Sequence, residues 1–75
     1  MTIKSNTTSK ALSASIDLLR DDVFTGRVDR RTAIIRQAVI RSKIHQATVI
    51  GFLTLAQAGE LDVFAIRAIE PDIPT

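Results

Sequence analysis

Residues 25–44, TGRVDRRTAIIRQAVIRSKI, contain the end of one predicted helix and most of the next. Gly26 suits the left-handed position that follows the last turn of a helix, and Asp29 is a good N-cap residue for the helix after it. The connection between them is short, which favours two antiparallel helices. We therefore predict a helical hairpin formed by residues 9–25 and 30–43.

A polar segment rich in Ser, Thr and Asn precedes the first of these helices. Thr8 or Ser9 is a plausible N-cap, so we predict a disordered polar tail over residues 1–8. Asp17 and Asp21 fall on the opposite side of the helix from its apolar seam. The apolar seam itself recurs at spacings of four, three and four residues: Leu12, Ile16, Leu19 and Val23.

The second helix carries two separate apolar strips when it is drawn with 100° per residue. The first strip is Ile34, Ile35, Ala38 and Val39, and the second is Ala33, Ile40 and Ile44. Because the first helix covers only one strip, the other needs a further packing partner. We predict that a second copy of the chain supplies it, in a symmetric dimer. The predicted dimer interface comprises Ala33, Ile40, Ile44, Val49, Phe52 and Leu53.

Beyond the hairpin, the apolar pattern predicts a third helix over residues 46–58, with Gly59 as its C-cap. Residues 42–46 contain neither Gly nor Pro, so the pattern leaves open whether the second helix continues through them. Asp62 can cap a short final helix over residues 62–69, although the β-branched residues there also suit a strand. We favour the helix.

The predicted fold class is therefore all-α: an antiparallel helical hairpin with one or two further helices, packed as a symmetric dimer. Residues 9–70 form a single helical domain, and residues 71–75 form an extended C-terminal tail with two prolines. A chain of 75 residues builds only a marginal core on its own, and it has no cysteine with which to form a disulfide. Oligomerisation is then the expected source of additional stability.

The net charge of +2 conceals a strong asymmetry along the chain. Residues 1–26 are neutral, residues 27–45 carry six basic residues against one acidic residue, and residues 46–75 carry one basic against four acidic residues. The three segments therefore contribute 0, +5 and −3. A basic centre followed by an acidic end favours charged partners.

Catalysis and metal binding find little support in the sequence. His45 is the single histidine and has no cysteine to activate, and no nucleophile motif or triad spacing is present. The carboxylates of the first helix have no histidine partner that would complete a metal site. We predict that the protein is not an enzyme, with no catalytic residues, no metal and no cofactor.

The sequence also predicts a location. The polar start of the chain has no apolar run after its early lysine, which argues against a secretory signal. The longest uncharged run, Ile44–Gly59, has sixteen residues and is shorter than a membrane span of about 20. We predict a cytoplasmic protein with no membrane partner.

Two kinds of partner remain, protein and DNA, and DNA binding is the alternative hypothesis. A dimeric DNA-binding transcriptional regulator would use the basic helix 30–43, with Thr32 and Gln37 as the polar side chains available to base edges. Against this hypothesis, the basic residues lie along two edges of the helix and form no single stripe. The residues of this alternative are Arg27, Arg30, Arg31, Arg36, Arg41 and Lys43.

The preferred hypothesis is protein binding, by self-association and by docking on a host protein with a basic surface. The acidic residues that would contact such a partner are Asp17, Asp21, Asp22, Glu60 and Asp62.

The segment DRRTAIIRQAVIR at residues 29–41, the polar N-terminus and the first amphipathic helix resemble small early-region proteins of Mu-like bacteriophages. Among these are quorum-sensing anti-activators, which bind a LuxR-type regulator and stop it from binding DNA. The resemblance covers size and helical layout over residues 9–60. It implies an all-helical dimer that inhibits a host transcription regulator in the bacterial cytoplasm by occupying its surface.

Overall fold

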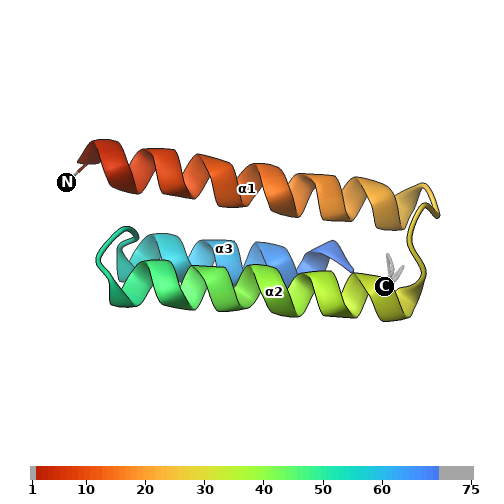
Figure 1. Ribbon diagram of the computed structural model, residues 1–75. Coiled ribbons are helices and arrows are strands. Elements are labelled where there is room, and N and C mark those ends of the chain that lie inside the picture. Colours follow the sequence, from red (N-terminus) through yellow and green to blue (C-terminus); the bar gives the residue numbers. More distant parts are fainter. Residues whose placement is uncertain (1, 70–75) are drawn as a thin grey trace, which may run out of the picture.

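The computed structural model describes residues 2–69, which contain three α-helices and no strand. The helices are α1 (Thr2–Phe24), α2 (Arg30–Val49) and α3 (Leu55–Ala68). They lie side by side and alternate in direction, so that α2 is antiparallel to both of its neighbours (Figure 1). Each helix packs against the other two. The prediction of an all-α fold is confirmed.

The first helix is longer than the sequence predicted. It begins at Thr2, so the prediction of a disordered tail is wrong for residues 2–8. Thr8 and Ser9 lie inside the helix, and neither is its N-cap. These residues include no glycine or proline, and nothing in them stops a helix from extending. The predicted seam faces the core: Leu12, Ile16, Leu19 and, in part, Val23. The tail predicted for residues 71–75 lies outside the described residues.

The turn between α1 and α2 forms as its residues predict. Gly26 has a φ of 75°, and its amide donates to the carbonyl of Val23 at 3.2 Å. The amide of the next residue donates to the carbonyl of Asp22 at 2.8 Å, which completes a Schellman closure of α1. Asp29 caps α2 by accepting a hydrogen bond of 2.7 Å from the Thr32 amide. That bond holds the pKa of Asp29 below its usual value.

The predicted helix over residues 46–58 is wrong, because a turn divides it. Helix α2 continues through residues 42–46 and ends at Val49. Gly51, with a φ of 84°, then repeats the Schellman closure. Its amide donates to the carbonyl of Thr48 at 3.1 Å, and the following amide donates to that of Ala47 at 2.8 Å.

Helix α3 begins at a capping box, three residues after the glycine of this turn. The Thr54 hydroxyl accepts from the Gln57 amide at 3.1 Å, and the Gln57 side chain accepts from the Thr54 amide at 3.0 Å. Gly59 and Asp62 both lie inside α3. The predictions that Gly59 ends one helix and that Asp62 caps the start of the next are therefore wrong. The preference for helix over residues 62–69 is confirmed for all but the last, since α3 ends at Ala68.

The core lies along the common axis of the three helices, and α2 turns one of its two apolar strips toward it. Ile16 and Leu19 of α1 have no exposed surface. The strip of α2 that faces them contains the three predicted residues and one more: Ala33, Ile40, Ile44 and Ala47. Helix α3 contributes Leu61, Ala65 and Ala68, and the turn contributes Leu53.

This core corrects the predicted dimer interface. Four of its six residues, Ala33, Ile40, Ile44 and Leu53, are buried within the single chain. The prediction assumed that α1 covers one strip of α2 and that a second copy of the chain covers the other. In the structure, one strip packs against both α1 and α3, because it faces the axis of the bundle.

Two glycine substitutions test the turn between α2 and α3. Gly59 lies in a helix, and a Cβ atom there meets no atom within 4 Å, so Gly59→Ala should raise the free energy of unfolding by up to about 1 kcal/mol. Gly51→Ala should lower it by about 1 kcal/mol, because the left-handed backbone disfavours a side chain. Urea titration of both variants measures the two changes. If Gly59→Ala were the destabilising one, the helix would end at residue 59.

Candidate functional site

The first of the two apolar strips of α2 lies on the surface, and we call it the outer face of α2: Ile34, Ile35, Ala38 and Val39. The three larger side chains are 45%, 58% and 49% exposed in that order. They point away from the core because they lie about half a turn round the helix from Ile40 and Ile44. Scattered exposed aliphatic residues are ordinary, whereas a contiguous strip on one helix is a candidate interaction surface.

A groove between α1 and α2 widens this surface on one side. It is lined by Leu18 and Ser15 of α1 and by Ile35, Arg36, Val39 and Ile40 of α2. Leu18 is 56% exposed and is the largest apolar side chain that α1 adds. The outer face of α2 therefore continues, with apolar contacts, onto α1.

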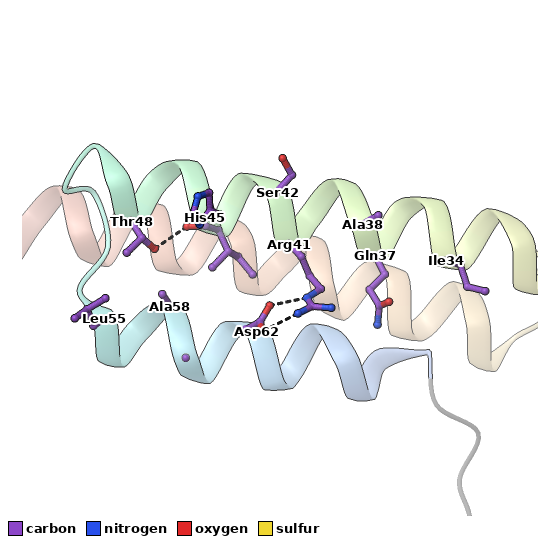
Figure 2. Close-up of a pocket in the computed structure, with 12 residues that line it drawn as sticks. Ile34, Gln37, Ala38, Arg41, Ser42, His45, Thr48, Leu55, Ala58 and Asp62 are labelled. Carbon is purple, nitrogen blue, oxygen red and sulfur yellow. Dashed lines mark hydrogen bonds and ion pairs between the residues drawn. The ribbon is translucent and has the colours of Figure 1, made fainter.

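A second groove separates α2 from α3 on the other side of the outer face (Figure 2). Ile34 and Ala38 line it from α2, and Leu55 and Ala58 line it from α3. Gly59, also in the lining, leaves open space where a side chain would stand. The groove has a volume of about 820 Å³ and is open to solvent. Its small residues leave room for the backbone of a partner to approach.

Exposed apolar residues also gather where α2 meets α3. Val49 and Phe52 of the predicted dimer interface are exposed here, unlike the other four residues of that prediction. Ile50 and Leu55 lie beside them in the sequence, and Leu55 is 82% exposed. Leu55 also lines the α2–α3 groove, so this end of the bundle is continuous with the outer face of α2.

Helix α2 carries five basic residues and no acidic residue, and two of the five are held by ion pairs with neighbouring helices. Arg36 donates to Asp22 of α1 at 2.8 Å, and this hydrogen bond holds the pKa of Asp22 below its usual value. Arg41 binds both carboxylate oxygens of Asp62 at 2.7 and 3.1 Å, across the α2–α3 groove (Figure 2). The Asp62 carboxylate raises the pKa of Arg41.

The other three basic residues of α2, Arg30, Arg31 and Lys43, are exposed and form no ion pair with any other described residue. Arg30 and Arg31 stand in the first turn of α2, where the helix dipole is already positive and basic residues are unfavourable. Lys43 lies one turn beyond Val39. The outer face of α2 is therefore apolar in its middle, with Arg31 at its N-terminal end and Arg30 and Lys43 along its edges.

The acidic residues predicted to bind a partner are not brought together. Asp17 and Asp21 are exposed on α1, and Glu60 is exposed on α3. Asp22 and Asp62 are used in the ion pairs with α2, and Arg27 also lies 3.5 Å from Asp21. The five residues form no single acidic surface, because two of them join helices to one another.

The six residues of the DNA-binding alternative are divided in the same way. Arg27, Arg36 and Arg41 are engaged by acidic residues of the chain. Gln37, expected to reach base edges, donates instead to the backbone carbonyls of Ala65 and Ile66 at 2.9 and 3.3 Å. Helices α2 and α3 run antiparallel and do not cross as a helix-turn-helix pair does (Figure 1).

His45 is exposed at the edge of the α2–α3 groove. The described part of the chain contains no group of three or more His, Cys, Asp or Glu residues placed to hold a metal ion. Among the described helices, none combines the length and the apolar character needed to cross a membrane.

One feature of the sequence distinguishes the buried strip of α2 from the outer face. The buried strip runs the length of the helix without a charged residue, from Ala33 to Ala47. The outer side also carries Arg31, Ser42 and Gln46 at the same angles as its aliphatic residues. This mixture of polar and apolar residues indicates a surface in contact with water.

Comparison of the chain with protein families, with curated proteins and with solved structures found no match. The resemblance to small phage proteins therefore stays a prediction from the sequence.

Proposed function

We propose that this protein is a non-enzymatic binding module that docks a partner protein on the outer face of α2. The observation that carries the proposal is the exposure of Ile34, Ile35 and Val39 in one strip between two grooves. The three helices bury a continuous core without these residues. Fully burying an exposed aliphatic side chain is worth about 1.5–3 kcal/mol, and a partner would gain about half of this from each of these half-exposed ones.

The shape of the surface suits such a partner. Helix α2 is about 30 Å long, and a groove widens its outer face on each side. The outer face of α2 with Leu18 and Leu55 offers an apolar centre surrounded by polar residues, which is the usual anatomy of an interface. A regulator that acts by covering part of its partner's surface needs no site beyond such an interface.

Two finer proposals rest on the sequence alone. The resemblance to phage proteins supports a role as an inhibitor of a host transcription regulator of the LuxR type. A symmetric dimer is the second, and it would use the part of the interface first predicted that stays exposed, Val49 and Phe52, since the other four residues are core.

Co-purification with matched variants tests the docking surface. Val39 is 49% exposed on the outer face of α2, and Val63 is 50% exposed on α3. A partner should be retained from a cell extract by the wild type and by Val63→Asp, and lost with Val39→Asp, because an unpaired carboxylate would lie in the interface. Equal retention by both variants would place the interface elsewhere.

A further inference from the structure

We infer that the outer face of α2 takes an acidic amphipathic helix of a partner protein, an inference that rests on the proposed function. The charge of the surface carries it. The basic residues of α2 that form no ion pair with a described residue surround the apolar strip, with Arg31 at its N-terminal end and Arg30 and Lys43 along its two edges. No acidic residue lies on α2 to neutralise them.

The placement of two arginines in the first turn of α2 strengthens the argument. Arg30 and Arg31 add to the positive end of the helix dipole, an arrangement that disfavours the folded helix. Asp29, the N-cap of α2, offsets part of this charge but forms no ion pair with either arginine. Carboxylates from a partner would relieve this repulsion, and the same carboxylates would gain charge-assisted hydrogen bonds.

The geometry of α2 specifies the pattern that the partner must carry. Arg31 and Lys43 are twelve positions apart, which is about 18 Å along the helix axis. The aliphatic residues of the outer face lie between them and alternate between the two grooves. A partner helix complements this surface when its apolar residues recur every three or four positions and carboxylates flank them.

The charge layout disfavours the other occupants. A second copy placed against the outer face would oppose one basic α2 with another, because the exposed acidic residues Asp17, Asp21 and Glu60 lie on α1 and α3. Duplex DNA suits the basic residues around the surface, but its phosphates would meet Ile34, Ile35 and Val39 in the middle.

Three labelled peptides of equal length test the partner chemistry on the full chain by fluorescence anisotropy. The first is an amphipathic helix with leucines on one face and glutamates elsewhere, and the second replaces every glutamate with lysine. The third keeps the acidic composition but disperses the leucines so that no apolar face forms. The first peptide should bind at least about tenfold more tightly than either of the others, and its affinity should fall with salt.

Matched variants locate the binding. Arg31→Glu should weaken the acidic amphipathic peptide by about tenfold, whereas Arg67→Glu, an exposed arginine of α3, should change it by less than about twofold. Val39→Lys should weaken the peptide less than Val39→Asp, since both remove the apolar contact but only the aspartate repels the peptide. Circular dichroism of each variant verifies that its helices are intact.

Several results would overturn the inference. Binding of the lysine peptide as tightly as the glutamate peptide would remove the charge argument. Tighter binding of a short DNA duplex, lost in Arg31→Glu but kept in Val39→Asp, would make nucleic acid the occupant. If the protein sediments as a dimer and Val39→Asp dissociates that dimer, the occupant of the outer face is a second copy of the chain. If a co-purified protein depends on Val39 while the acidic peptide fails to bind, the docking surface stands and the acidic partner is wrong.

Discussion

Leu19→Ala is expected to lower the free energy of unfolding by about 2–5 kcal/mol, which is most of the margin of a domain of this size. Leu19 has no exposed surface and lies in the core where α1 meets the other two helices. The truncation removes apolar contacts and leaves a cavity that three packed helices cannot fill by moving. Urea titration followed by circular dichroism measures the loss.

Leu18→Ala is the matched control, because it changes the same residue type at the next position of the same helix. Leu18 is 56% exposed, so its truncation should change the free energy of unfolding by less than about 0.5–1 kcal/mol. Similar losses in the two variants would mean that α1 is rotated from the orientation described here. A larger loss in Leu18→Ala would mean that its neighbours in the α1–α2 groove form part of the core.

Ile40→Asp is expected to unfold the protein, and the unfolding should be independent of protein concentration. Ile40 is 7% exposed and packs inside the single chain, so the new carboxylate would be buried without an ion-pair partner, at a cost of several kcal/mol. Unfolding of a dimer would instead depend on concentration, because dissociation is coupled to it. Thermal melting at two widely separated concentrations distinguishes the two cases.

Val39→Asp is the control for this substitution. Its side chain lies on the outer face of α2 and is about half exposed, so the aspartate remains hydrated and the helices should keep most of their stability. A folded Ile40→Asp protein that is merely monomeric would contradict the core described here. In that case Ile40 would lie in an interface between two copies of the chain.

The ends of the helices are decided by short stretches of sequence. Gly26 and Asp29 could be assigned in advance because each acts on backbone groups within a few residues of itself. Gly51 and the pair Thr54 and Gln57 carry the same kind of information for the second turn. The turn is hidden in the sequence because the apolar residues around Gly51 continue a helical period across it.

The candidate site could be predicted only in part. The two apolar strips of α2 and the excess of basic residues on it are visible in the sequence. Which arginines remain available for a partner depends on Asp22 and Asp62, which approach α2 from other helices. Ion pairs between residues distant in the chain follow no local pattern. Residues of the predicted acidic and basic surfaces therefore pair with each other inside the chain, which the sequence did not predict.

The amino-acid pattern specifies that the chain is helical, where α1 ends and α2 begins, and that α2 has two apolar strips. The polar residues beside the outer strip distinguish the two strips only weakly, and the packing of the three helices determines which one is buried. A strip with Ile40 and Ile44 and a strip with Ile35 and Val39 gain similar free energy from burial, so hydrophobicity alone does not choose between them. The choice depends on where α3 packs, because the strip that faces both α1 and α3 is covered on two sides and the other is left to solvent.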